Sequence, residues 1–194
     1  MTDSARVGVD QLTLTIYGTD TSLNQRSTVR DLYAEIYAEP PYNEGPDEAE
    51  DFASGWHRTI DQRNFRLVIA RRADEPIGFA FGVQLRARTK WWNGALTALP
   101  DDITTEHTGR TFAIIELAVR DPYRRRGVGR QLHAHLTAGL SEERITLLVR
   151  PEASAPQQAY LSWGYRVVGQ IQPFPDAPIY NVMIKQLMCF ATKS

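Results

Sequence analysis

A basic, glycine-containing loop stands between an apolar run and the start of a helix, and it constrains this chain more than any other feature. Residues 117–119 end the apolar run, a turn with Pro122 follows, and residues 124–130 are rich in arginine and glycine. Backbone N–H groups of such a loop and of the next helical turn point at one spot, where the helix dipole adds partial positive charge. The stretch therefore predicts an anion site.

The side chains of this stretch suit a phosphate group. Gly127 and Gly129 carry no Cβ, so the backbone can approach a bulky anion closely. Guanidinium groups offer forked donors that match phosphate oxygens. The arginines concerned are Arg124, Arg125, Arg126 and Arg130. We interpret the loop as a pyrophosphate site, and the alternative is a basic turn that merely joins a strand to a helix.

Two other phosphate-binding loops are excluded by their residues. The chain has no Gly-x-x-x-x-Gly-Lys-Ser/Thr run, and a dinucleotide fingerprint fails because Leu132 stands where its last glycine or alanine is needed. The remaining pattern resembles the acyl-CoA signature of the GNAT superfamily of N-acetyltransferases, Gln/Arg-x-x-Gly-x-Gly/Ala after a strand that ends Leu-x-Val. The resemblance implies that acetyl-CoA is the co-substrate. The cofactor-binding residues that it implies are Leu117, Ala118, Val119, Arg124, Arg125, Arg126, Gly127, Val128, Gly129 and Arg130.

Hydrophobic periodicity predicts alternating strands and helices along most of the chain. We expect strands at 12–17, 67–70, 77–83, 112–119, 145–149, 165–171 and 179–187. Helices are expected from a capping box at Thr28 to just before Pro40, near 46–56, at 129–140 and at 155–163. This order matches the α/β (α+β) GNAT fold from Leu12 to Leu187. The resemblance implies a mixed, mostly antiparallel sheet of about seven strands, flanked by helices and splayed between strands 4 and 5 to admit the pantetheine arm.

The length and composition favour one domain over residues 1–194. With 194 residues and 42% hydrophobic content, the chain is long enough for one filled core. Residues 86–110 interrupt the periodicity, and we treat them as an inserted segment. Trp91 and Trp92 in this segment either wall an acceptor pocket or pack the insertion against the sheet.

Two residues are candidates for catalysis. Tyr160 begins a stretch that resembles the family element Tyr-x-x-x-Gly-Phe/Tyr, whose tyrosine lies near the coenzyme sulfur, and a phenol can donate a proton to a thiolate. The alternative is a buried helix tyrosine. Glu116 lies in an otherwise apolar strand, where burial would raise its pKa and suit it to act as a base. The alternative is a strand-end glutamate paired with an arginine.

The resemblance implies a role for the backbone of residues 117–119, but two family side chains are missing from this sequence. It implies that the backbone of residues 117–119 binds pantetheine and acetyl, with the Val119 N–H facing the thioester oxygen. Some relatives carry a base glutamate on the fifth strand, where Leu148 stands here, and an asparagine at the position of Ala153. Neither the fifth-strand base nor the asparagine contact to the coenzyme can therefore be assigned to this chain.

Bulk properties point away from several classes of protein. A formal net charge of -1 gives no sign of a nucleic-acid or membrane partner. His133 and His135 are two residues apart on a helix and so point to different faces, and we predict no metal site. Cys189 is the single cysteine, which excludes an internal disulfide. It falls just beyond the last expected strand, and no other feature of the sequence suggests a covalent acyl-enzyme. The polar N-terminus and the lack of a long apolar run predict a cytoplasmic protein, and a homodimer stays open.

These observations predict an acyl-CoA-dependent N-acyltransferase. We expect it to transfer acetyl from acetyl-CoA to a primary amine by direct attack in a ternary complex. The alternative is a non-catalytic acyl-CoA-binding regulatory module. The acceptor is not identified by the sequence, although Glu39, Glu44 and Asp176 could hold a cationic amine.

Overall fold

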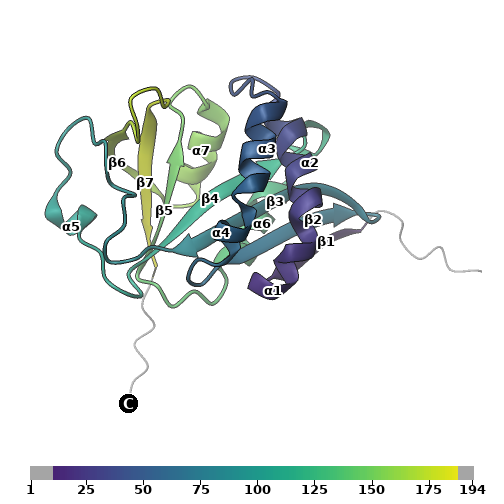
Figure 1. Ribbon diagram of the computed structural model, residues 1–194, viewed down its shortest axis with the longest axis horizontal. Helices are drawn as coiled ribbons and strands as arrows, with labels where there is room; N and C mark the ends of the chain where they lie inside the picture. Colours follow the sequence, from purple (N-terminus) through teal and green to yellow (C-terminus); the bar gives the residue numbers. More distant parts are fainter. Residues whose placement is uncertain (1–10, 188–194) are drawn as a thin grey trace, which may run out of the picture. The chain divides into compact units, whose positions relative to one another are not determined.

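The structure is a computed structural model that describes residues 11–187, and its strands form one mixed sheet (Figure 1). The strand order is β1-β2-β3-β4-β5-β7-β6. β4 and β5 are parallel, whereas β1 with β2, β5 with β7 and β6 with β7 pair antiparallel. The strands are β1 (Leu12–Tyr17), β2 (Arg66–Arg72), β3 (Glu75–Gln84), β4 (Thr111–Val119), β5 (Arg144–Val149), β6 (Arg166–Ile171) and β7 (Tyr180–Gln186). The predicted fold class is confirmed.

Helices flank the sheet, and most lie where the sequence predicts them. They are α1 (Thr19–Ser22), α2 (Arg26–Tyr37), α3 (Pro46–Ser54), α4 (Trp56–Ile60), α5 (Asp101–Thr104), α6 (Val128–Thr137) and α7 (Ser154–Ser162), with 3-10 turns η1 (Leu23–Gln25) and η2 (Asp121–Tyr123). The predicted capping box at Thr28 is wrong, because α1 and η1 lead directly into α2 and place Thr28 inside that helix. α6 ends before the predicted residue 140, since Ala138 is extended and Gly139 takes a positive φ of 64°.

The described residues divide into two compact units. The first holds residues 11–61, 66–81 and 116–138, and the second holds residues 62–65, 82–115 and 139–187. β3 and β4 contribute residues to both units. The expectation of one domain stays a prediction.

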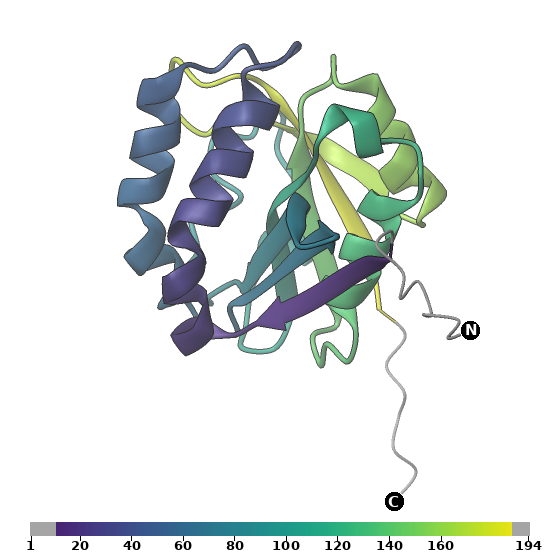
Figure 2. The ribbon, with the colours of Figure 1, turned by 90° about the vertical axis from the view of Figure 1, so that its right-hand side faces the viewer.

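The first unit has helices on both faces of its strands (Figure 2). α2 and α3 lie side by side on one face, and α6 packs on β1 and β2 from the other. Val29, Leu32 and Ile36 of α2 are buried, as their helical spacing predicts. α6 buries Leu132 and Leu136 in the same way. This packing fixes the N-terminal end of α6, which follows the basic loop.

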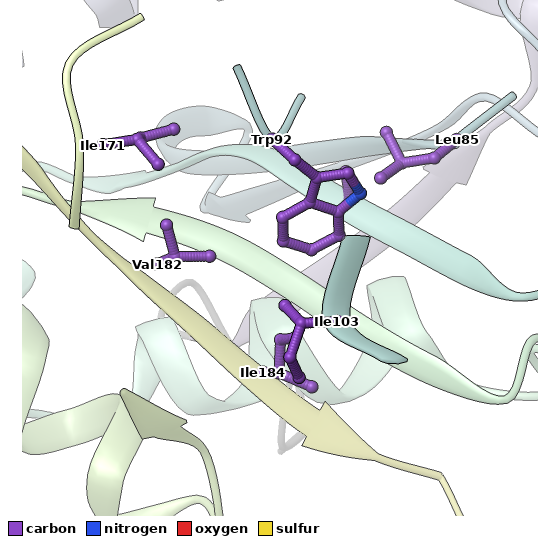
Figure 3. Close-up of a cluster of buried hydrophobic side chains, with 7 residues drawn as sticks. Leu85, Trp92, Ile103, Ile171, Val182 and Ile184 are labelled. Carbon is purple, nitrogen blue, oxygen red and sulfur yellow. The ribbon is translucent and has the colours of Figure 1, made fainter. Parts of the chain in front are cut away.

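The second unit carries the inserted segment. Ala95 forms an isolated β-bridge with Ile171, and the Leu96 N–H donates to the Gln170 carbonyl. Trp92 is 7% exposed and packs among aliphatic side chains (Figure 3). The cluster consists of Leu85, Trp92, Ile103, Ala113, Ile171, Val182 and Ile184. The packing interpretation of Trp92 is therefore confirmed.

The parallel β4–β5 ladder is short. It joins Thr111–Ile114 to Arg144–Leu147 and ends there, although β4 continues to Val119. The ladder thus stops before residues 117–119, the backbone for which the resemblance implies pantetheine contacts. Within residues 11–187, no helix combines the length and the apolar character needed to cross a bilayer.

Candidate functional site

The segment of residues 124–130, which we call the phosphate loop, turns sharply and then runs into the first turn of α6, which begins at Val128. Gly127 is the N-cap of α6 with φ 81°, and Arg125 also has a positive φ of 57°. A left-handed backbone favours glycine, and a Cβ built on Gly127 would meet nothing within 4 Å. Val128, the first helical residue, is 5% exposed and anchors the helix start. The loop therefore presents an open glycine face at a helix N-terminus, as anion binding requires.

The arginines of the phosphate loop divide into two kinds. Arg124 is half-buried: its Nε donates to the Val119 carbonyl at 2.8 Å, and its guanidinium pairs with Glu39 at 2.7 Å and with Asp121 at 3.3 Å. The other three are exposed, namely Arg125, Arg126 and Arg130. Arg124 thus ties the loop to the end of β4 and to the residues after α2, while further cations lie along the rest of the loop.

The end of β4 is held in place by close strand packing. Ala118 and Val119 are buried. A Cβ on Gly78 of β3 would lie 2.7 Å from the Ala118 carbonyl oxygen, so only glycine permits this approach. The Arg120 N–H donates to the Ile77 carbonyl at 3.0 Å, and its guanidinium pairs with Glu35 and Glu75. These contacts keep the backbone of residues 117–119 in one position.

Glu116 lies one residue before this backbone and is hydrogen-bonded to a tyrosine. The Tyr37 hydroxyl of α2 donates to Glu116 Oε2. Burial raises the pKa of Glu116 to about 7, the negative Glu44 also raises it, and the Tyr37 hydrogen bond lowers it. Burial likewise raises the pKa of Tyr37 well above its ordinary value, which keeps the phenol protonated as a donor. A carboxyl with a pKa near neutrality can accept a proton at physiological pH.

The alternative interpretation of Glu116, a partner for an arginine, is wrong. Within residues 11–187 its carboxyl forms no ion pair and its partner is Tyr37. Sequence reasoning did not identify Tyr37 as the partner of Glu116. A buried tyrosine hydroxyl needs a hydrogen-bond partner, and that requirement was the available clue.

Aromatic rings surround the Tyr37–Glu116 pair. The Tyr37 ring stacks on Tyr33 at 4.4 Å and meets Tyr42 edge-on at 4.7 Å. Tyr33 also stacks on Phe52 of α3 at 4.3 Å, and its hydroxyl donates to Glu44 Oε2 at 2.6 Å. The first unit therefore carries two tyrosine–glutamate pairs, one helical turn apart on α2.

Tyr160 belongs to the second unit. It lies in α7, is 8% exposed, and contacts the rings of Trp163 at 5.4 Å and Tyr165 at 5.6 Å. Burial raises the pKa of Tyr165, and Tyr160 adds to that effect. Ala153 is the N-cap of α7. The role of Tyr160 as an acid stays a prediction.

The three carboxylates expected near an acceptor differ in their surroundings. Glu39 is paired with Arg124, Glu44 accepts from Tyr33, and Asp176 is exposed between β6 and β7. In the part of the chain that the structure describes, no group of three or more His, Cys, Asp or Glu side chains could hold a metal ion. Cys189 lies outside the described residues.

Comparison with known proteins identifies the family. The family model described as "Acetyltransferase (GNAT) family" matches residues 28–165. No curated protein matches the chain. Similar solved structures include PaiA N-acetyltransferase from Thermoplasma acidophilum in complex with coenzyme A, at 10% identity and a TM-score of 0.61, covering 91% of this chain and 99% of that one.

Two further structures agree in fold. An acetyltransferase from Thermus thermophilus is 15% identical with a TM-score of 0.58, covering 92% of this chain and 99% of that one. The structure of yncA from Salmonella typhimurium with its cofactor acetyl-CoA is 12% identical with a TM-score of 0.56, covering 95% and 98%. Because the matching family model covers more than half of its length, this chain belongs to the acetyltransferase (GNAT) family.

Proposed function

We propose that the chain transfers an acetyl group from acetyl-CoA to a primary amine by direct attack in a ternary complex. Membership of the family supports acetyltransferase activity in general. The observation that carries the proposal is that one compact unit holds both a glycine- and arginine-containing turn at a helix N-terminus and a carboxyl group with a pKa of about 7. Two structurally similar proteins were solved with coenzyme A or acetyl-CoA, which supports the same co-substrate here.

The phosphate loop fits the pyrophosphate of coenzyme A. Gly127 offers an open face at the start of α6, and the loop arginines supply positive charge. The backbone of residues 117–119 would contact pantetheine, and the Val119 N–H would stabilise the negative oxygen that develops on the thioester carbonyl. Leu117, Ala118 and Val119 act here through the main chain.

Glu116 and Tyr160 would divide the proton transfers between them. The amine nitrogen forms a bond to the carbonyl carbon, and the carbon–sulfur bond breaks to release the thiolate of coenzyme A. Glu116 accepts the proton that the amine loses, which a carboxyl with a pKa of about 7 can do near neutral pH. Tyr160 donates a proton to the departing sulfur. The products are an amide and free coenzyme A.

Two measurements test this proposal: release of the coenzyme A thiol reports turnover, and calorimetry reports the binding of acetyl-CoA. The protein is incubated with acetyl-CoA and with benzylamine, 1,4-diaminobutane or a tetrapeptide that has a free α-amino group, and products are identified by mass. We expect release of coenzyme A with one of these amines and a loss of about 10²–10⁴ in rate for Glu116→Gln. Tight binding of acetyl-CoA without turnover on any amine would instead support the non-catalytic acyl-CoA-binding module.

A further inference from the structure

The two tyrosine–glutamate pairs of the first unit are built from adjacent turns of one helix. Tyr33 and Tyr37 are four residues apart on α2, so they lie on the same face, and their rings stack. Each hydroxyl donates to a different carboxyl, Tyr33 to Glu44 and Tyr37 to Glu116. The two carboxyl groups are therefore close enough for the charge of one to act on the other.

Glu44 is held beside Tyr37 by the backbone as well. Its N–H donates to the Tyr37 carbonyl at 2.9 Å, so the loop after α2 folds back onto the end of that helix. Tyr42 of the same loop packs edge-on against the Tyr37 ring. Tyr33 stacks on the same ring, so two aromatic contacts hold the Tyr37 side chain whose hydroxyl donates to Glu116. Ring packing and the hydrogen bond therefore act on the same side chain.

The hydrogen bond makes the two oxygens of Glu116 unequal. Tyr37 occupies Oε2 as a donor, and a donor stabilises the ionised form of a carboxyl. A proton from an attacking amine would then go to Oε1. A hydrogen bond to one oxygen also restricts rotation of the carboxyl group.

We propose that Tyr37 is a positioning residue for Glu116: its hydroxyl orients the carboxyl through Oε2, favours its ionised form, and leaves Oε1 to accept the proton of the amine. This inference rests on the proposed role of Glu116 as the base. Glu44 acts in the opposite direction, because its negative charge disfavours ionisation of Glu116. The groups that face the carboxyl and its donor are Tyr37 and Tyr33 on α2 and Tyr42 and Glu44 in the following loop.

The first experiment measures the Glu116 carboxyl directly and needs no substrate. Its ¹³C NMR signal is titrated in glutamate-labelled protein and assigned by its disappearance in Glu116→Gln. In Tyr37→Phe we expect the midpoint to rise from about 7 to about 8, since a hydrogen bond to a charged group is lost. Tyr33→Phe is the matched control, with one hydroxyl removed a single turn away, and its midpoint should stay at the wild-type value. Glu44→Gln should lower the midpoint.

The second experiment uses activity with whichever panel amine turns over. At pH 7 a midpoint raised by about one unit lowers the ionised fraction, and with it kcat/KM, about fivefold. At pH 9 the carboxyl is ionised in both proteins, so Tyr37→Phe should match wild type. A purely structural role predicts the same loss at both pH values. Should Tyr37→Phe not fold, 3-fluorotyrosine at position 37 keeps the ring and strengthens the donor, and the midpoint should fall below the wild-type value.

The outcomes separate the two proposals. An unchanged midpoint and pH profile in Tyr37→Phe, with Glu116→Gln inactive, would overturn the inference about Tyr37 and leave Glu116 as the base. Full activity of Glu116→Gln would instead overturn the base itself. A raised midpoint with activity restored at pH 9 supports both.

Discussion

Breaking one buried ion pair should strongly destabilise the second unit, because it leaves a charge buried without its partner. Arg144 opens β5 with its side chain 2% exposed, and its Nη2 lies 2.8 Å from Oε1 of Glu106, whose side chain is fully buried. Arg144 also donates to Thr111 Oγ1 at 2.8 Å and to the Ile103 carbonyl at 2.7 Å, and it lies over the Trp92 ring at 5.4 Å. The pair therefore fastens the inserted segment to the sheet.

We predict that Arg144→Met lowers the free energy of unfolding by about 3–5 kcal/mol, because it leaves the Glu106 carboxylate buried without its cation. For a chain of this size, each kcal/mol corresponds to about 2–4 °C, so the melting temperature should fall by about 6–20 °C. Replacing Glu106 as well removes the stranded charge. Arg144→Met/Glu106→Met should therefore be less destabilised than the sum of the two single variants.

Urea denaturation followed by tryptophan fluorescence and circular dichroism measures these differences. Arg166→Met, an exposed arginine at the start of β6, is the matched control and should change stability by less than about 0.5 kcal/mol. A loss below about 1 kcal/mol for Arg144→Met would refute the reasoning. Strict additivity in the double variant would refute it too, since it would mean that the two charges do not interact.

Three further predictions concern the proposed co-substrate and acid. Gly127→Val or Gly129→Val should abolish acetyl-CoA binding in calorimetry while the protein stays folded, because a branched side chain fills the phosphate site and, at Gly127, disfavours φ 81°; unchanged affinity would contradict the assignment. Coenzyme affinity should weaken as salt rises, since exposed arginines are screened, and a pantetheine fragment that binds as well as the whole coenzyme would argue against phosphate contacts. Tyr160→Phe should lower the rate about 10²–10³-fold with coenzyme affinity unchanged. A rate within about threefold of wild type would mean that Tyr160 is not the acid.

Local pattern was enough to predict most of the fold. Strand alternation, helical spacing and proline positions place each strand within two residues of its observed bounds, because these features depend on neighbours along the chain. The glycine and arginine spacing of residues 124–130 likewise predicted the turn that leads into α6. The predicted start of a helix at Thr28 was wrong, because α1 and η1 lead directly into α2 there.

The partners of the buried charges were decided by tertiary structure alone. Tyr37 and Glu116 are 79 residues apart, and Arg144 and Glu106 are 38 apart, so no periodicity connects them. The sequence indicated that Glu116 needed a partner, access to water or a raised pKa, because a charge in an apolar strand is costly to bury. It did not indicate a tyrosine, because that choice depends on how α2 packs over β4. The sequence shows that a polar residue in an apolar strand requires a hydrogen-bond or ion-pair partner or access to water. The packing of elements that are distant in the sequence determines which residue becomes that partner.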